Sequence, residues 1–525
     1  MAAIEPKITY TSTPEQIEAM QARFDDALVE VEKEFGTVYP QIINGEDRTS
    51  QQLFDVVAPA RTSLVLGRFP KGTRKDVDDA IATAKAFQPK WDATPWEERV
   101  RLVKAAADKV RERKFKLAAI MIRECGKSRT EAIGEVEEGA DLLEYYATVF
   151  VENDAYQKKM GSEDPRERNT SVLRPVGVWG IMSPFNFPNA LAAGPIGAAL
   201  VTGNTVVFKP ASATAISGYE LTRAILDGGI PAGALQFVTG GGAEVGDYLV
   251  HHPQTDGVVF TGSKETGMDL HNSFSTTYPK PIITEMGGKN PTIVTKNADL
   301  DKAVEGVARS AFGFSGQKCS ACSRAYVDAS IYDAFMDLLV KRTGELKVGD
   351  PTDRDVFIGP VIDESAVERY EDAVEIAKRD GGTVRYGGER LTGEGFEKGT
   401  FVEPTIVDNL PLDHELFKRE LFLPFIAVAP VDSLEQALKE ANDVEYGLTA
   451  GIFSEDKEEV GTFFDKIEAG VVYANRKGGA TTGAWPGSQS FTGWKGSGSS
   501  GKGALGEYYP ALFMREQSRT VVIDD

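Results

Sequence analysis

Cys319 stands in a setting that suits a nucleophile. It follows a predicted helix and a glycine-containing turn over residues 312–316, and Lys318 directly precedes it. A neighbouring cation and nearby backbone N–H groups lower the pKa of a thiol, which a nucleophilic cysteine needs. A buried structural cysteine is the competing interpretation, because that is the more common role of an isolated cysteine.

The spacing of Cys319 and Cys322 permits two further interpretations. A Cys-x-x-Cys pair can be a redox dithiol or half of a zinc site. The sequence has no second such pair, and its four histidines are distant from this one in sequence, so no metal site is predicted. Three cysteines are also too few for a disulfide framework, which favours a reducing cytoplasm.

Two other side chains could act in the same reaction. Glu285 lies at the end of an apolar predicted strand, residues 281–286, so its carboxylate could serve as a general base toward water. Asn186 lies in a turn between Pro184 and Pro188, and an amide N–H held there could stabilise an oxyanion. The alternatives are an ion-paired or helix-capping glutamate and a turn asparagine that bonds its own backbone.

Two glycine-rich turns, at residues 240–246 and 260–267, each follow a predicted strand and begin a helix. That context suits a pyrophosphate group, although neither turn has the full Gly-x-Gly-x-x-Gly pattern. Lys209 ends another predicted strand and adds a cation or ribose donor nearby. These features indicate a nucleotide site at one edge of a sheet.

Strands and helices that could position these groups alternate from residue 172 onward. The predicted strands are residues 176–182, 205–209, 236–239, 258–261 and 281–286, and the predicted helices are residues 189–201, 216–227, 245–251 and 265–274. This alternation predicts a parallel, doubly wound α/β sheet. A second alternating block covers about residues 291–470, and the apolar run 520–523 is typical of an edge strand.

The first 150 residues are predicted to be mostly helical from their apolar spacing. The predicted helices are residues 14–35, 77–88, 96–113, 115–125 and 132–150. The polar segment 152–170 follows them and is interpreted as a linker or an excursion to another part of the molecule.

The bulk composition narrows the class of protein. A chain of 525 residues predicts two or three domains, and its net charge of -21 argues against nucleic acid or an anionic membrane as a partner. The N-terminus has no basic region followed by an apolar run, so we expect no signal peptide. The uncharged stretch 175–208 is interrupted by prolines and asparagines, which predicts a buried strand–helix–strand rather than a membrane span.

Taken together, these motifs closely resemble the aldehyde dehydrogenase superfamily over about residues 60–525. The matching segments, in the order of the family, are residues 183–188, 260–263, 285–290, 312–319 and 420–422. Glu285 and Cys319 are 34 residues apart, which is the usual gap in that family. The joint pattern outweighs the structural interpretation of each motif taken alone.

The resemblance implies an α/β fold with a Rossmann-type parallel-sheet cofactor domain, an α/β catalytic domain and a small β flap for oligomerisation. The implied divisions are residues 1–154 and 175–286 for NAD(P) binding, 287–484 for catalysis, and 155–174 and 503–525 for the oligomerisation arm. The expected partners are therefore a small-molecule aldehyde and further copies of the chain in a homo-oligomer.

The family also implies roles for individual residues. Cys319 would form a thiohemiacetal with the aldehyde, Asn186 and the Cys319 N–H would hold its oxyanion, and Glu285 would activate water to hydrolyse the thioester. The residues implied in cofactor binding are Ser183, Phe185, Lys209, Ser212, Gly242, Gly246, Gly262, Ser263, Glu420 and Phe422.

The implied cofactor is NAD, and one departure from the family bears on it. Ser212 stands where the family often has a carboxylate that holds the adenine ribose hydroxyls. Without that acid a 2′-phosphate meets less repulsion, so we expect NADP to be tolerated as well.

Within the superfamily, residues 145–147, 316–324 and 475–477 look like 1-pyrroline-5-carboxylate (L-glutamate γ-semialdehyde) dehydrogenase. The residues thereby implied in substrate binding are Glu138, Phe187, Ser320, Gly493 and Trp494. Ser320 and the backbone at Gly493 and Trp494 would bind the substrate α-carboxylate, because loop N–H groups suit an anion. Phe187 would pack on the aliphatic chain.

The predicted reaction is thus the NAD(P)-dependent oxidation of L-glutamate γ-semialdehyde to L-glutamate, as the last step of proline breakdown. A second hypothesis keeps the chemistry for another semialdehyde or an aliphatic aldehyde. Hypotheses of a different class are a non-catalytic family member, which would lack Cys319 or Glu285, and a thiol-redox protein using Cys319 and Cys322.

Overall fold

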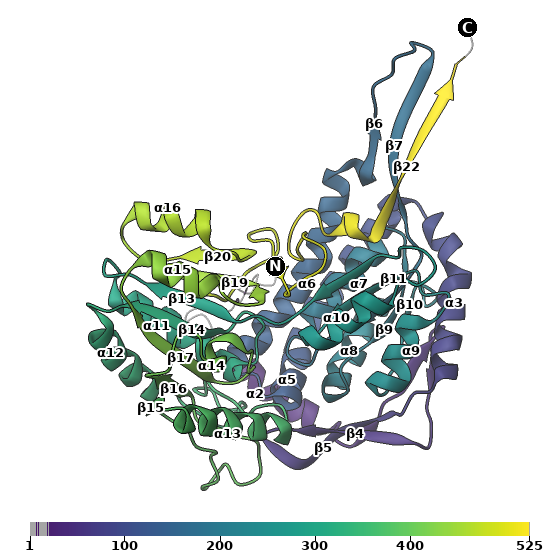
Figure 1. Cartoon of the computed structure of the whole chain (residues 1–525). Coiled ribbons are helices and arrows are strands. Elements are labelled where there is room, and N and C mark those ends of the chain that lie inside the picture. Colours follow the sequence, from purple (N-terminus) through teal and green to yellow (C-terminus); the bar gives the residue numbers. More distant parts are fainter. Residues whose placement is uncertain (1–6, 8, 10–17, 19, 524–525) are drawn as a thin grey trace.

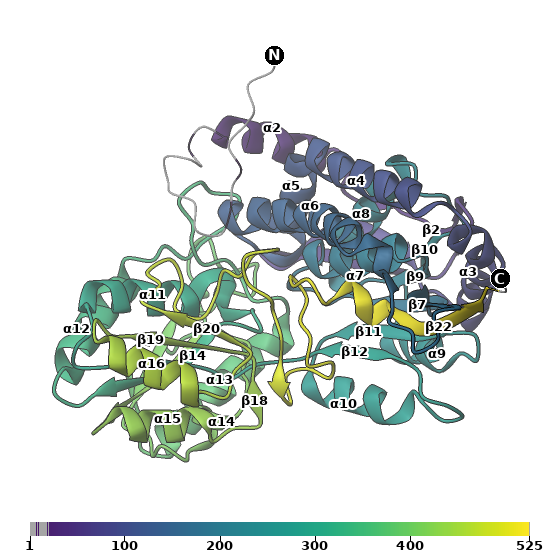
Figure 2. The same cartoon turned by 90° about the horizontal axis from the view of Figure 1, so that it is seen from above.

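The computed structural model describes residues 7, 9, 18 and 20–523. Two seven-stranded sheets form two lobes, and a narrow three-stranded sheet projects from the first lobe (Figure 1). Seen from above, the C-terminal tail, residues 475–513, runs from between the lobes onto the first lobe (Figure 2). The start of the helix predicted at residues 14–35 lies outside the described residues, and its remainder is α2 (Gln21–Glu32).

The first sheet has the strand order β12-β11-β8-β9-β10-β2-β3. Its strands are β2 (Gln41–Ile43), β3 (Glu46–Arg48), β8 (Val178–Met182), β9 (Thr205–Lys209), β10 (Leu235–Phe237), β11 (Gly257–Thr261) and β12 (Ile282–Glu285). The five strands from β12 to β10 are parallel, which confirms the predicted parallel sheet. Every residue of β8 and β9 is buried, as expected for parallel strands whose faces are both covered.

The helices of this lobe follow the predicted pattern. They are α3 (Arg74–Asp92), α4 (Trp96–Glu112), α5 (Lys114–Cys125), α6 (Arg129–Glu152), α7 (Ala190–Val201), α8 (Ala215–Asp227), α9 (Asp247–His251) and α10 (Lys264–Ser273). Local capping fixes where some of them begin: Thr73 and Asp76 bond reciprocally at the start of α3, and Ser128 caps α6. The apolar α7 packs against α6, deep inside the lobe.

The expectation of a mostly helical N-terminal region is wrong for residues 37–70. That stretch forms β2 and β3 together with β1 (Thr37–Val38), β4 (Leu53–Ala58) and β5 (Arg61–Pro70), and the last three make a separate sheet. These strands carry a weak sequence signal, because β1 and β3 are very short and polar side chains lie exposed on them. A period of two residues cannot be recognised over two or three positions.

The uncharged stretch 175–208 is the strand β8, the helix α7 and the strand β9, which confirms the predicted strand–helix–strand. The helix has only 12 residues, too few to span a bilayer. Throughout the described part of the chain, no helix is both long and apolar enough to cross a membrane.

The second sheet confirms the predicted second alternating block. Its order is β15-β16-β17-β14-β13-β19-β20, and only the pairing of β15 with β16 is antiparallel. The strands are β13 (Asn290–Val294), β14 (Cys322–Asp328), β15 (Thr383–Tyr386), β16 (Thr405–Asp408), β17 (Phe425–Val431), β19 (Thr449–Phe453) and β20 (Val471–Ala474). The helices are α11 (Leu300–Phe312), α12 (Tyr332–Gly344), α13 (Glu364–Arg379), α14 (Glu415–Lys418), α15 (Leu434–Asn442) and α16 (Lys457–Lys466).

The projecting sheet contains β6 (Gln157–Lys159), β7 (Glu167–Pro175) and β22 (Met514–Val522), with β22 on one edge (Figure 1). The C-terminal run is thus an edge strand, as predicted, and its pairing partner within the chain is β7, antiparallel from Met514 opposite Pro175 to Val522 opposite Glu167. Segment 152–170 accordingly forms an excursion. The division of the chain into cofactor domain, catalytic domain and arm stays a prediction.

Candidate active site

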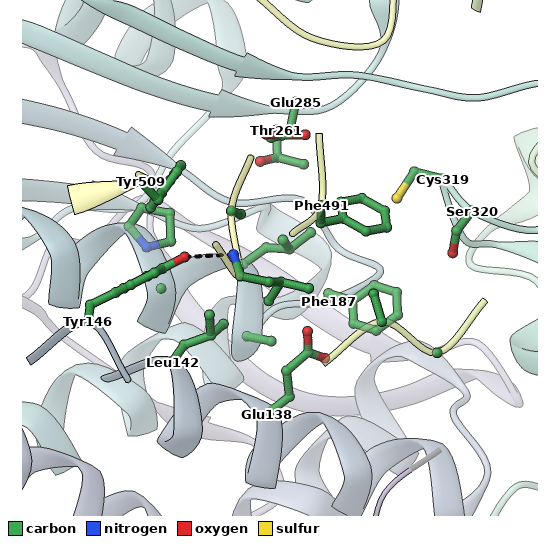
Figure 3. Close-up of a pocket in the computed structure, with 18 residues that line it drawn as sticks. Glu138, Leu142, Tyr146, Phe187, Thr261, Glu285, Cys319, Ser320, Phe491 and Tyr509 are labelled. Carbon is green, nitrogen blue, oxygen red and sulfur yellow. Dashed lines mark hydrogen bonds between the residues drawn. The ribbon is translucent and has the colours of Figure 1, made fainter. Parts of the chain in front are cut away.

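A cavity of about 700 Å³, part of it open to solvent, contains the predicted nucleophile (Figure 3). Helices α6 and α7, the ends of β11 and β12, the loop that carries Cys319 and the C-terminal tail all contribute to its wall. The lining residues are Glu138, Leu142, Tyr146, Phe187, Ala190, Leu191, Gly194, Pro195, Thr261, Glu285, Cys319, Ser320, Gly483, Ala484, Phe491, Ala504, Leu505 and Tyr509. Cys319 and Glu285, distant in sequence, thus face one space.

The backbone before Cys319 is shaped by a left-handed turn. After α11 the chain enters a short 3-10 segment, Gly313–Gly316, in which Phe314 and Ser315 have φ values of 51° and 55°. Gly316 also has a positive φ, and a Cβ there would collide with the carbonyl of Leu423. The turn ends the helix and directs the following loop, with Cys319, into the cavity (Figure 3).

The predicted lowering of the Cys319 pKa by Lys318 is wrong. The ammonium of Lys318 instead donates to Glu131, with Nζ 2.6 Å from Oε1. Burial raises the pKa of the Cys319 thiol to about 12, and the carboxyl groups of Glu420 and Glu285 add to this rise. The backbone N–H groups of Ser320 and Cys319 act in the opposite direction, as predicted, but more weakly. At neutral pH the thiol is therefore protonated in this structure.

Glu285 is the last residue of β12, and its carboxyl group faces the cavity. Burial raises its pKa to about 8, because an ionised carboxylate loses hydration inside the protein. Among the described residues its Oε2 is buried and has no hydrogen-bond partner. A carboxyl group whose pKa lies near neutrality, with an unpaired oxygen in the cavity that a thiol also lines, suits proton transfer.

Asn186 lies close to the nucleophile loop but is absent from the residues that line the cavity. It is buried, and its Nδ2 donates to the carbonyl of Gln317 at 3.1 Å, two residues before Cys319. An amide nitrogen carries two hydrogens, so one remains for another acceptor. The geometry supports the predicted oxyanion donor by placing the amide against this loop.

Asn290 is a positioning residue that the sequence did not single out. Its Nδ2 donates to the carbonyl oxygens of Cys319 at 2.7 Å and Ala321 at 2.9 Å, and its Oδ1 accepts from the N–H of Thr449. The first two bonds hold the backbone at and just after the nucleophile, and the third ties Asn290 to the start of β19. The available signal was its place as the last residue of the matched glutamate segment, residues 285–290.

The predicted cofactor residues gather at the carboxyl edge of the first sheet and in the facing loop. Because β8, β9, β11 and β12 are parallel, the residues that follow them share that edge. The residues brought together there are Ser183 and Phe185 after β8, Lys209 and Ser212 at β9, Gly242 and Gly246 after β10, and Gly262 and Ser263 after β11. Across from them, Glu420 accepts from the Gly288 N–H at 2.9 Å, and the ring of Phe422 contacts Phe185 edge-on with centroids 5.9 Å apart.

These residues fit a dinucleotide. Within the described chain the Ser183 hydroxyl is buried without a hydrogen-bond partner, and space at Gly242 is open. The Lys209 ammonium is buried, which lowers its pKa to about 8, and it donates to the Pro210 carbonyl. Ser263 caps α10, whose N-terminus suits a phosphate. An ammonium and a hydroxyl can donate to phosphate or ribose oxygens, and the carboxylate of Glu420 can accept from ribose hydroxyls.

The predicted substrate residues divide into two groups. Glu138, Phe187 and Ser320 line the cavity (Figure 3). Gly493 and Trp494 do not, because Trp494 pairs with Gly447 in the short sheet of β18 (Tyr446–Gly447) and β21 (Trp494–Lys495). That pairing leaves the indole 49% exposed, beside a separate cavity.

The tail contributes Gly483 and Ala484 to the cavity in their place. The hydroxyl of Thr481 donates to the Ser320 carbonyl at 2.7 Å and so ties this part of the tail to the nucleophile loop. Gly483 and Ala484 were not predicted from the sequence. Their only signal was a run of small residues, Gly-Ala-Thr-Thr-Gly-Ala, which has no periodicity.

Comparisons with known proteins agree with this architecture. The aldehyde dehydrogenase family matches residues 46–517. A 1-pyrroline-5-carboxylate dehydrogenase of Geobacillus sp. (strain WCH70) is 38% identical over 513 residues, 96% of each chain. A second, from Halalkalibacterium halodurans, is 40% identical over 511 residues, again 96% of each chain. The crystal structure of 1-pyrroline-5-carboxylate dehydrogenase from Thermus with bound NAD has a TM-score of 0.93 at 33% identity and covers the whole of both chains. The chain belongs to the aldehyde dehydrogenase family.

Proposed function

We propose that this enzyme oxidises L-glutamate γ-semialdehyde, the open-chain form of 1-pyrroline-5-carboxylate, to L-glutamate with NAD as the hydride acceptor. The names of its relatives support this substrate and cofactor. The observation that carries the proposal is the cavity, where a thiol and a carboxyl group face groups that suit an amino acid.

The cavity offers a complementary group to each part of the substrate. Ser320, Gly483 and Ala484 line the cavity with small side chains, which suits binding of an α-carboxylate by backbone N–H groups. Glu138 lines it with a carboxyl group that suits the α-ammonium. The ring of Phe187 suits the methylene chain (Figure 3). We therefore assign substrate anchoring to Gly483 and Ala484 rather than to Gly493 and Trp494.

The first half of the reaction is carried by Cys319. Its sulfur attacks the aldehyde carbon, while its proton leaves to a base, and a thiohemiacetal forms. The amide of Asn186 and the Cys319 N–H hold the oxyanion. When bound, NAD would supply the acceptor for the hydride of the thiohemiacetal carbon, and Cys319 would then carry the acyl group as a thioester.

The second half is carried by Glu285. As a carboxylate it takes a proton from water, and the resulting hydroxide attacks the thioester carbon. The C–S bond breaks, the glutamate product leaves with its new carboxylate, and the thiol is restored. Lys209, Ser183 and Glu420 would hold the cofactor through this cycle.

A kinetic comparison of aldehydes tests the substrate. We expect kcat/KM for glutamate semialdehyde to exceed that for the amino acid semialdehydes that are one methylene shorter or longer by roughly 10-fold or more. One missing or extra methylene changes binding of the transition state by about this much in a pocket that fits the chain. Measured with both cofactors, turnover should also occur with NADP, because Ser212 presents no carboxylate to the 2′-phosphate. Equal kcat/KM across chain lengths, or a preference for unsubstituted aliphatic aldehydes, would point to a different semialdehyde or aldehyde.

We also propose that the projecting sheet joins copies of the chain into a homo-oligomer. On its outer strand Val521 and Val522 are 60% and 56% exposed, and an open β edge with apolar side chains favours pairing. Introducing lysine at both valines should lower the mass in light scattering to that of a smaller assembly or a monomer. Val29→Lys, at a comparably exposed valine on α2, is the matched control. An unchanged mass in the double variant would remove this surface from the interface.

The cellular setting that we propose is the cytoplasm. Cys125, Cys319 and Cys322 are all free thiols, and the proposed chemistry requires Cys319 to stay reduced. The partners are then a small-molecule aldehyde and other copies of the chain.

A further inference from the structure

A fully buried lysine lies behind the active-site cavity. Lys127, in the turn between α5 and α6, has no solvent exposure, and its ammonium forms an ion pair with the equally buried Glu135. A charge taken wholly out of water needs partners that replace its hydration. Besides Glu135, the groups around Lys127 belong to the segments that carry the proposed catalytic residues.

Two aromatic rings complete the surroundings of the ammonium. Lys127 Nζ lies 3.7 Å from the ring centroid of Phe187 and 4.7 Å from that of Phe314. Phe187 follows the oxyanion donor Asn186, whereas Phe314 belongs to the left-handed turn that leads to Cys319. One cation therefore contacts both segments whose relative position the reaction depends on, and cation–π attraction favours both contacts.

The first two turns of α6 hold the same two segments. Glu135 Oε1 accepts from the backbone N–H groups of Asn189 at 2.7 Å and Ala190 at 3.2 Å, just after the oxyanion segment. Glu131, one turn earlier on the same face, pairs with Lys318, which directly precedes Cys319. A rigid helix thus sets the spacing of the two attachment points, and Lys127 lies between them.

We propose that Lys127 is a positioning residue that fixes the oxyanion segment, residues 186–190, relative to the nucleophile loop. It acts through Phe187, Phe314 and Glu135 and does not touch the reacting atoms. The inference rests on the proposed function, since it takes Cys319 as nucleophile and Asn186 as oxyanion donor.

Two variants separate positioning from stability. Lys127→Met keeps the stem and removes the charge, and we expect kcat for the aldehyde to fall roughly 10- to 100-fold with KM changed little, since small misplacements cost about this much. This variant also leaves Glu135 buried without its cation, so its melting temperature should fall. The double variant Lys127→Met with Glu135→Gln removes both charges and should recover much of that melting temperature, but kcat should stay low.

Matched controls make the outcome decisive. Lys114→Met breaks another ion pair between α5 and α6, with Glu137 at 2.9 Å, and should leave kcat within about twofold of wild type.

If Lys127→Met fails to fold, Phe314→Leu tests the same claim. It keeps the charge pair, removes one ring contact and should lower kcat without raising KM. Recovery of kcat together with melting temperature in the double variant, or wild-type kcat in Lys127→Met or Phe314→Leu, would overturn the inference. A wild-type enzyme without aldehyde oxidation would instead overturn the proposed function.

Discussion

Cys319→Ala should abolish aldehyde-dependent reduction of NAD, with kcat lower by at least about 10³-fold, because no thioester can form without the sulfur. The substitution removes one atom from a loop that two Asn290 hydrogen bonds hold, so the fold should remain intact. Cofactor binding, measured by titration in the absence of aldehyde, should stay at wild-type affinity. Loss of cofactor binding together with turnover would mean that the variant disturbs the site as a whole.

Cys322→Ser is the matched control for the nucleophile. Cys322 is buried in β14, where its Sγ lies 3.1 Å from the hydroxyl of Thr292, a partner that a serine can retain. We expect this variant to keep aldehyde oxidation at nearly the wild-type rate. If it instead lost activity as completely as Cys319→Ala, the two cysteines would be acting together, and the thiol-redox hypothesis would replace the proposal.

Much of the fold was predictable because its signals are local. In the first sheet the parallel strands are short, largely buried and mostly apolar runs such as β9, and glycine-rich turns follow two of them. The strands between residues 37 and 70 escaped prediction because several are too short to show a two-residue period, and because β2 pairs partly with a strand far along the chain. In β2, Ile42 pairs with Phe237, and the sequence around Ile42 does not predict that contact.

The site was predictable to the extent that it lies on regular elements. Glu285 at a strand end and Cys319 after a helix could be placed, because the edge of a parallel sheet is where such residues converge. The direction in which the Lys318 side chain points could not be predicted, because its partner Glu131 lies 187 residues away in sequence. Gly483 and Ala484 were missed for a related reason: an irregular tail has no period from which to infer which residues face inward.

Burial has one consequence for Cys319 and Glu285 together. It raises both pKa values, to about 12 and about 8, so both groups are mainly protonated at neutral pH. Two anions would lose hydration and repel each other at these positions, so the neutral pair is the stable state. The ionised carboxylate becomes abundant only as the pH rises toward 8, and hydrolysis of the thioester should follow its population.

Glu285→Gln should therefore stop turnover after one half-reaction. The thiol can still attack the aldehyde and hydride can still leave, but no carboxylate remains to activate water. We expect a burst of reduced cofactor close to one equivalent per active site, followed by a steady rate lower by roughly 10²- to 10⁴-fold. Rapid-mixing absorbance measures the burst, and mass spectrometry of the quenched enzyme should find the acyl group on Cys319.

The pH profile decides whether Glu285 acts as this base. In the wild type the hydrolysis rate should rise with pH and level off above about 8, where the carboxyl group is ionised, and in Glu285→Gln that rise should vanish. Glu124→Gln is the matched control, because burial also raises the pKa of Glu124 to about 8. The Glu124 carboxyl group does not line the cavity and accepts hydrogen bonds from the N–H groups of Ile216 and Ser217. A profile that kept its rise in Glu285→Gln, or lost it in Glu124→Gln, would assign the titration to another group. A burst absent from Glu285→Gln would instead place Glu285 before hydride transfer, as the base that takes the proton from the Cys319 thiol.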